Sequence, residues 1–244
     1  MLLKPLALLE PAAPYSSGDL SLRRRPSVVD AIGEFLNGVQ RRWQRECRRR
    51  KVGRAYDMAL EVARAVPRGS RVLDVGCGNG FIAHHLSAML GTNVTGIDLD
   101  QSAQAPIDYQ RFDGTHFPVA DKSFDGVLFC YVLHHAQDLS ALLNEVRRVL
   151  RPGGLMVVYE DIPELWWDRF ICSIHNRQWR ARTGPCTFRR KEEWQDTFAV
   201  EGFEILNERT LRRVRNLAHP VCRRLFVLKL NATQCSPSTS ANLL

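Results

Sequence analysis

Apolar and polar residues alternate along the middle of the chain in two ways. Short runs rich in Val, Ile, Leu and Phe are typical of buried strands, and the stretches between them repeat apolar residues every three or four positions, as helices do. This alternation favours an α/β fold in which crossover helices join parallel strands. Strands are predicted over 71–75, 93–97, 109–112, 126–131 and 155–159, and helices over 80–89 and 139–150.

Two further helices are predicted before the first strand. Apolar residues recur at helical spacing from Val28 to Trp43, and a second helix is expected over 56–66. The other face of the first helix is rich in arginine. It could meet anionic lipid, nucleic acid or an acidic substrate, although a solvated helix face is the simpler interpretation.

The periodic pattern is lost after the fifth strand. Residues 161–186 contain three tryptophans and are predicted to form an irregular lid or substrate segment. Thr187 is expected to cap a helix that runs to Phe198. A terminal antiparallel pair of strands is predicted over 203–207 and 225–230.

These elements predict a single domain over 27–230, in which 27–66 is a helical cap. A length of 244 residues suits one α/β domain with short appendages. The first 26 residues mix short apolar pieces with prolines and charges, which predicts a flexible basic arm rather than a membrane span or a secretory signal. Residues 231–244, rich in Ser, Thr and Asn, are predicted to be a disordered tail.

The composition is that of an ordinary globular protein, with 45% hydrophobic and 25% charged residues, and it indicates neither a disordered nor a membrane protein. Most of the net charge of +8 lies in the first 70 residues, so the rest of the chain is nearly neutral. The seven cysteines are scattered and form no C-x-x-C pair. A disulfide framework or zinc finger is therefore not expected, and a reducing cytoplasm is the predicted location.

The most informative stretch is the apolar strand that runs into a Gly-rich turn at residues 72–80. Glycines allow a ligand to approach the bare backbone. A dinucleotide site would need Gly-x-Gly-x-x-Gly, but here the third glycine comes one position early and Phe81 stands where that motif has it. A carboxylate at Asp74 would repel a phosphate and favour a cationic ammonium group.

A second carboxylate, Asp98, stands at the end of the next strand. It can accept hydrogen bonds from both hydroxyls of a ribose, a role shared by several nucleoside cofactors. Further motifs follow along the chain: Phe112-Asp113-Gly114, Val132-Leu133-His134-His135 and Arg151-Pro152-Gly153-Gly154.

With these motifs, residues 54–230 resemble the class I methyltransferases of the ubiquinone/menaquinone-methylase-like group, also called methyltransferase type 11. The resemblance implies S-adenosylmethionine as cofactor. It also implies a Rossmann-like fold whose sheet has seven mostly parallel strands, an antiparallel terminal strand and helices on both faces. One departure is the short connection over 101–108, which contains Pro106 and leaves no room for the helix that the group usually has there.

By the same resemblance, the backbone at Gly76 and Gly78 cradles the methionine part of the cofactor, and Asp74 lies near its amino group. The ribose would bind Asp98, and Tyr131 would lie near the sulfonium. Leu99 would flank the adenine, with Asp113 accepting from its amino group. The full implied cofactor set is Asp74, Gly76, Cys77, Gly78, Gly80, Asp98, Leu99, Asp113, Gly114 and Tyr131.

Methyl transfer needs a base only if the acceptor atom begins protonated, because the cofactor brings the reactive carbon. His135 is a candidate base or a structural and substrate-orienting residue. Glu160 and Asp161 end the fifth strand and are the other catalytic candidates. They could orient the substrate, act as base or bind a metal with His175, but no metal is included in the predicted site.

The predicted function is methyl transfer to a small hydrophobic or aromatic acceptor at O, N or C. An RNA or protein methyltransferase that grips its substrate with the basic helix is the alternative, and a non-catalytic cofactor-binding protein is a third interpretation. A membrane span is not expected, whereas peripheral membrane contact and the oligomeric state stay open.

Overall fold

The computed structural model describes residues 28–100, 103–211 and 220–231. The chain divides into two units, residues 1–46 and 47–244. In the first unit only the helical residues from Val28 onward are described, so the predicted arm over 1–26 lies outside the described residues. The predicted tail also lies outside them, except for Asn231.

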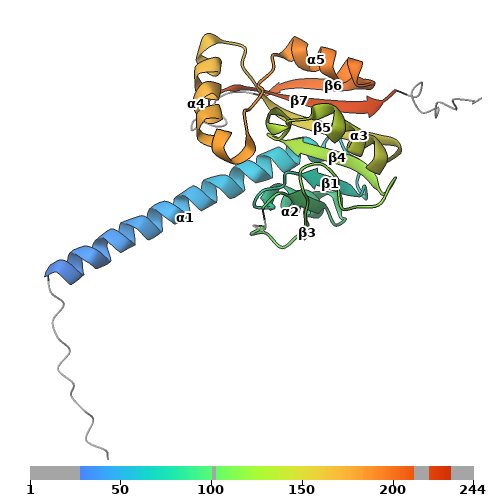
Figure 1. The fold of residues 1–244 in the computed structure, drawn as a ribbon. Coiled ribbons are helices and arrows are strands. Elements are labelled where there is room, and N and C mark those ends of the chain that lie inside the picture. Colours follow the sequence, from blue (N-terminus) through green and yellow to red (C-terminus); the bar gives the residue numbers. More distant parts are fainter. Residues whose placement is uncertain (1–27, 101–102, 212–219, 232–244) are drawn as a thin grey trace, which may run out of the picture. The chain divides into compact units, whose positions relative to one another are not determined.

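The second unit is built on a seven-stranded sheet with the order β3-β2-β1-β4-β5-β7-β6 (Figure 1). From β3 to β5 neighbouring strands run parallel, and β7 is antiparallel to both of its neighbours. The predicted fold class is confirmed. The strands are β1 (Val72–Val75), β2 (Thr95–Asp98), β3 (Asp108–Arg111), β4 (Phe124–Cys130), β5 (Leu150–Ile162), β6 (Phe203–Leu211) and β7 (Cys222–Leu230).

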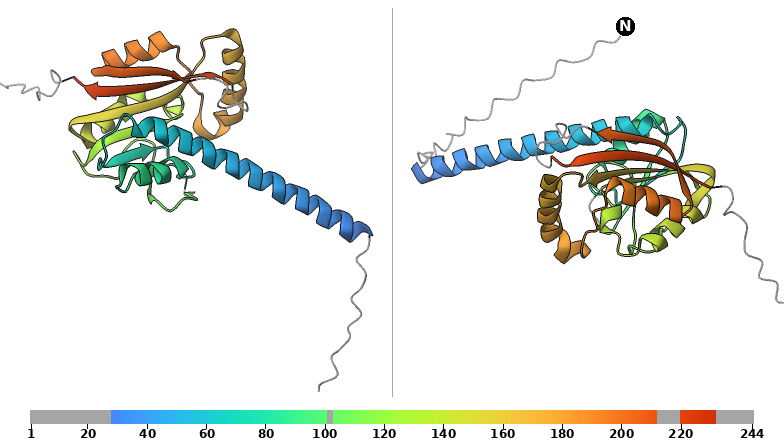
Figure 2. Two further views of the ribbon diagram at one scale, coloured as in Figure 1. Left: turned by 180° about the vertical axis from the view of Figure 1, so that it is seen from behind. Right: turned by 90° about the horizontal axis from the view of Figure 1, so that it is seen from above.

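Helices cover both faces of this sheet (Figure 2). Buried residues of α2 and of the C-terminal part of α1 belong to one core cluster, and buried residues of α3 and α5 belong to the other. Strand β4 supplies both clusters in alternation, which explains why its sequence is a continuous apolar run. The helices are α1 (Val28–Ala63), α2 (Phe81–Leu90), α3 (Leu139–Val149), α4 (Trp166–Thr183) and α5 (Lys191–Val200), with a 3₁₀ turn η1 (Leu133–His135).

The prediction of two N-terminal helices is wrong, because α1 is continuous from Val28 to Ala63. The apolar spacing stops after Trp43, but the residues that follow are mainly Arg, Lys, Gln and Glu. These side chains have high helix propensity and continue the backbone hydrogen bonding without a buried face. The part of the chain that the structure describes contains no helix long and apolar enough to cross a membrane.

The segment predicted to be irregular over 161–186 consists mostly of helix α4. At the N-terminus of α4, Leu165 N donates to Asp168 Oδ2 at 2.9 Å. The helix ends at Gly184, whose φ is 77°. The apolar side chains of α4 are largely exposed, which explains why no buried periodicity marked it in the sequence. Whether the segment acts as a lid stays a prediction.

The next helix, α5, begins at Lys191 rather than after Thr187. Its first turn is closed by Arg190 N, which donates to Glu193 Oε2 at 2.6 Å. Thr187 instead donates its backbone N–H to His134 O at 2.7 Å. The predicted cap was wrong because this hydrogen bond holds the 184–190 connection against η1.

Candidate active site

The Gly-rich turn between β1 and α2 takes the backbone conformation that glycine allows. Gly76, Gly78 and Gly80 have φ values of 70°, 53° and 77°. A Cβ at Gly76 would lie 2.4 Å from Val132 Cγ2, whereas a Cβ at Gly78 would meet nothing within 4 Å. The turn is therefore packed at its first glycine and open at Gly78, where a ligand can approach the backbone.

Asp74, at the carboxyl half of β1, is a buried carboxylate whose two oxygens have no hydrogen-bond partner among the described residues. Burial, together with the charge of Asp98, raises the pKa of Asp74 to about 8. Buried polar atoms are almost always hydrogen-bonded, and an unpaired buried charge is costly. The site therefore fits a cationic hydrogen-bond donor beside Asp74.

Asp98 joins the end of β2 to the turn. Its Oδ2 accepts from Gly78 N at 2.7 Å, and its Oδ1 accepts from Asp100 N at 3.2 Å. The turn fits closely against β2, because a Cβ at Gly96 would lie 2.7 Å from Cys77 Sγ. The acid predicted to hold a ribose is thus beside the Gly-rich turn and fixed by backbone donors.

The first of two pockets, on one side of the turn, is lined by residues that include Leu99, Asp113, Gly114 and His135. Asp113 Oδ1 accepts three hydrogen bonds of 2.8 Å from the backbone and hydroxyl of Thr115 and the backbone of His116. These bonds lower the pKa of Asp113 to about 2. The structure thus brings together Leu99 and Asp113, the two residues that the resemblance implied for the adenine, with Gly114 of the implied cofactor set.

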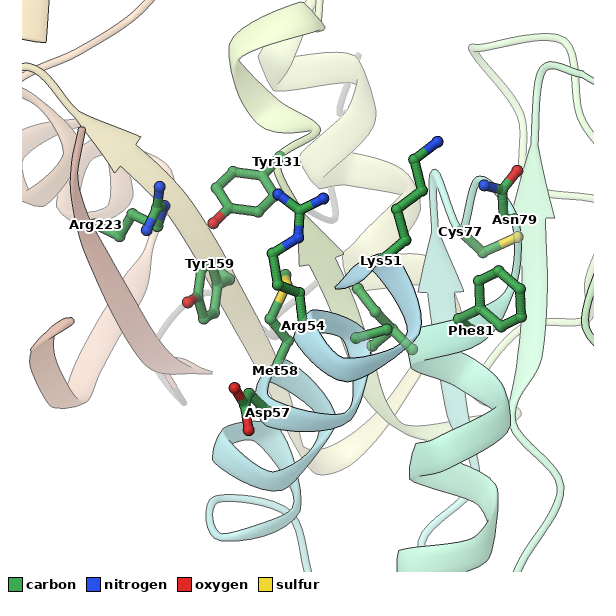
Figure 3. Close-up of a pocket in the computed structure, with 12 residues that line it drawn as sticks. Lys51, Arg54, Asp57, Met58, Cys77, Asn79, Phe81, Tyr131, Tyr159 and Arg223 are labelled. Carbon is green, nitrogen blue, oxygen red and sulfur yellow. The ribbon is translucent and has the colours of Figure 1, made fainter. Parts of the chain in front are cut away.

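A second pocket of about 240 Å³ contains Cys77 and Tyr131 together with residues that the sequence did not indicate (Figure 3). Figure 3 shows Lys51 and Arg54 projecting from α1 on one side and Arg223 from β7 on another. Its apolar and aromatic side chains are Met58, Phe81, Ile82, Tyr131 and Tyr159. The pocket therefore combines an apolar wall with three cationic groups and one carboxylate, that of Asp57.

Tyr131 follows β4 with a φ of 60°, a conformation that side-chain-bearing residues rarely adopt. Its backbone N–H donates to Tyr159 O at 2.8 Å, and the two rings meet edge to face at 5.2 Å. Strain of this kind persists where the surroundings determine the conformation, and it is common at functional sites. Here it directs the Tyr131 ring into the second pocket.

Glu160 and Asp161 lie on opposite faces of β5 because strand side chains alternate. Glu160 accepts from Leu133 N at 2.7 Å and lies 2.7 Å from His134 Nδ1, whereas Asp161 accepts from Arg223 Nε at 3.2 Å. Both carboxylates are buried, and neither is among the lining residues of the two pockets.

The half-buried His135 has its Nδ1 2.9 Å from Thr183 Oγ1 and 3.3 Å from Cys186 Sγ. Burial, together with the neighbouring His134 and His175, lowers the pKa of His135 to about 3. The imidazole is therefore neutral near pH 7 and is a weak proton acceptor. Its role in catalysis stays a prediction.

A family model described as a methyltransferase domain matches residues 73–158, which run from β1 to β5 and include the Gly-rich turn, Asp98 and Asp113. These residues form a class I methyltransferase domain. The match confirms the resemblance that the motifs indicated. The methyltransferase domain matched here covers the part of the sheet whose carboxyl ends carry both pockets.

Two relatives of the methyltransferase domain are named for lipophilic compounds. The chain is 38% identical over 105 residues to a sterol 24-C-methyltransferase of Gibberella zeae, a match that covers 38% of this chain and 28% of the relative. It is 30% identical over 149 residues to a 2-phytyl-1,4-naphtoquinone methyltransferase of Synechococcus elongatus, covering 54% of this chain and 58% of the relative. The match spans less than two thirds of either relative.

A solved structure supports the fold of the methyltransferase domain. A SAM-dependent methyltransferase from Methanosarcina mazei superposes with a TM-score of 0.56 at 18% identity, covering 70% of this chain and 96% of that one. The sequence motifs within the methyltransferase domain identified the residues around the Gly-rich turn. They did not identify Lys51, Arg54, Tyr159 and Arg223, because these residues reach the second pocket from α1, β5 and β7.

Proposed function

We propose that this protein transfers a methyl group from S-adenosylmethionine to a small hydrophobic acceptor. The observation that carries the proposal is the buried Asp74 carboxylate, which no group in the described part of the chain hydrogen-bonds, next to a turn that is open at Gly78. An amino acid's ammonium group would supply the cation and the donors that Asp74 lacks. A phosphate-bearing cofactor would bring negative charge to the same place.

The residues of the first pocket and the turn fit the remaining parts of this cofactor. Asp98 is placed to accept from a ribose, while Leu99, Asp113 and Gly114 surround a space suited to an adenine. Gly76, Cys77 and Gly80 shape the turn by close packing. When bound, the cofactor supplies a methyl group activated by a cationic sulfur.

The second pocket is the proposed acceptor site. Tyr131 and Tyr159 offer an aromatic wall, and the cations of Lys51, Arg54 and Arg223 outnumber the one carboxylate of the lining, Asp57. Such a combination selects an apolar molecule that carries an anionic oxygen, such as a carboxylate or phenolate. Cationic side chains stabilise the ionised form of such an acceptor, so an oxygen nucleophile would reach the site already deprotonated.

The catalytic candidates fit supporting roles in this proposal. Asp161 holds Arg223 by a buried ion pair, and the Arg223 guanidinium carbon lies 6.0 Å from the centre of the Tyr131 ring. Glu160 holds His134 beside His135. An ionised methyl acceptor needs no base to remove a proton. With a pKa of about 3, His135 would also be a poor base.

Lipophilic acceptors reach an enzyme most readily from a membrane surface, and α4 has a face suited to that contact. Leu165, Trp166, Trp167, Phe170 and Ile174 are exposed apolar residues at the start of α4 and along one of its faces. Asp168, the one acidic residue of α4, is buried, whereas its arginines at 169, 177 and 180 are exposed. Aromatic and cationic side chains together favour the surface of an anionic bilayer.

The relatives' names favour a lipophilic acceptor over RNA or protein, since they refer to a sterol and a phytylnaphthoquinone.

The proposed location is the cytoplasm. Free thiols at Cys47, Cys77, Cys130, Cys172 and Cys186 support a reducing compartment.

Calorimetry with S-adenosylmethionine and S-adenosylhomocysteine tests the proposed cofactor. Both compounds should bind at sub-millimolar concentration, and Asp74→Asn should lose about 1.5–3 kcal/mol of affinity, the usual loss for a hydrogen bond to a charged group. Asp196→Asn, at an exposed position on α5, is the matched control and should bind normally. Failure of both compounds to bind the folded protein would refute the proposed function.

A further inference from the structure

Three histidines from two separate segments meet next to the first pocket. His134 and His135 belong to η1 at the end of β4, and His175 comes from α4. One ring nitrogen of each residue lies within 4.8 Å of those of the others. The ring centres of His134 and His135 are 4.1 Å apart, and that of His175 is 5.3 Å from the first and 5.5 Å from the second.

His134 is oriented by a carboxylate so that one nitrogen is available. Its Nδ1 lies 2.7 Å from Glu160 Oε2, which makes Nδ1 the donor and leaves the lone pair on Nε2. The side chain is only 1% exposed, and Nε2 has no hydrogen-bond partner in the described residues. In metal sites, a histidine that binds the ion through one ring nitrogen commonly donates the N–H of the other to a carboxylate.

Aromatic side chains fix the planes of two of the rings. Phe188 stacks on His134 with the ring centres 4.5 Å apart, and Trp179 stacks on His175 at 5.9 Å. The two rings are thus held with little freedom to turn away.

We propose that His134, His135 and His175 bind a divalent transition metal ion of the zinc class, with Glu160 as the positioning residue behind His134. Imidazole nitrogens suit Zn²⁺, Co²⁺ and Ni²⁺, whereas Mg²⁺ and Ca²⁺ prefer oxygen ligands. Nitrogens on one tetrahedral zinc at about 2.1 Å lie roughly 3.4 Å apart. Movements of about an ångström from the present separations therefore complete a three-histidine site with one open position.

The ion would connect α4 to the end of β4, because its ligands come from both. His135 also lines the first pocket, so the metal would hold one wall of that pocket in place. This inference does not rest on the proposed methyl transfer, since it concerns the binding of metal alone.

Zinc content and zinc affinity of the full chain test the site. Protein loaded with Zn²⁺ and then dialysed should retain about one ion per chain, and Co²⁺ should give the visible absorption of a four-coordinate site. His175→Gln should lower zinc affinity at least tenfold, and Glu160→Gln should lower it roughly 10- to 100-fold, the usual loss for such a partner. His84→Gln, at an exposed histidine on α2, is the matched control and should bind zinc as the wild type does.

Thermal unfolding of the wild type with and without a chelator is a second measurement. It does not require the zinc-site variants to fold. The chelator should lower the melting temperature of the wild type and of His84→Gln. Absence of a stoichiometric ion from the loaded wild type would overturn the proposal. Equal zinc affinity in folded His175→Gln would do the same.

Discussion

Asp74 shows how a single buried group can link ligand binding to pH. Its carboxyl has a pKa of about 8, so it is mostly protonated at pH 6. Pairing with an ammonium group would lower that pKa, and binding would then release a proton. Affinity must therefore rise with pH until the carboxyl is ionised before the ligand arrives.

We expect the affinity for S-adenosylhomocysteine to rise by up to about tenfold for each unit between pH 6 and pH 8. Calorimetry in two buffers with different ionisation enthalpies will measure both the affinity and the number of protons released. Asp74→Asn should remove the slope, because an amide does not titrate. An affinity that is the same at pH 6 and pH 8 in the wild type would contradict the role of Asp74.

The residues around the Gly-rich turn could be predicted because the chemistry there is contained in one short motif. Asp74 and Gly78 are four positions apart, and Asp98 follows at the end of the next strand. Arg223 could not be predicted in the same way. It lies far along the chain from Tyr131, and only the pairing of β7 with β5 brings the two side chains together.

At the level of secondary structure, α4 is where the pattern of the sequence was least informative. A helix that buries one face has a clear apolar stripe directed to the core, but most apolar residues of α4 are exposed. The middle of α1 also lacks a buried face, and for this reason two helices were predicted where the chain forms one. Strands such as β4 were predicted well, because burial on both faces gives a continuous apolar run.

The exposed face of α4 gives a prediction about lipid binding. Replacing Trp166 and Trp167 together by Ser should lower binding to vesicles of anionic lipid at least tenfold, because two interfacial anchors are lost. Val200→Ser, at an exposed apolar position on α5, is the matched control and should bind as the wild type does. Vesicle co-sedimentation measures the effect, and equal binding by the double variant would show that α4 does not contact the membrane.

For the whole molecule, cofactor binding should appear as thermal stabilisation. A ligand at 100 times its dissociation constant adds about 2.7 kcal/mol to the stability of the folded state. For a chain of this size that corresponds to a rise in melting temperature of roughly 5–10 °C. Differential scanning fluorimetry with S-adenosylhomocysteine measures this shift, and adenosine diphosphate should give none. A shift with the diphosphate alone would indicate a phosphate-bearing ligand instead.

The architecture of the sheet followed from the alternation of strands and helices together with the family resemblance. The parallel part needs only that each connection returns the chain to the same end of the sheet, which the link between β2 and β3 does with no helix among its described residues. The position of β7 between β5 and β6 does not follow from that rule, because β7 is antiparallel to both neighbours and is separated from β5 in the chain by α4, α5 and β6.

That position has a consequence for synthesis of the protein. Of the strands that the structure describes, β6 is hydrogen-bonded only to β7, and β7 comes after it in the chain. A nascent polypeptide that has left the ribosome only as far as β6 cannot yet attach that strand to the sheet. Arg223 is also still missing at that moment, so the second pocket gains this cationic lining residue only when translation has passed β7.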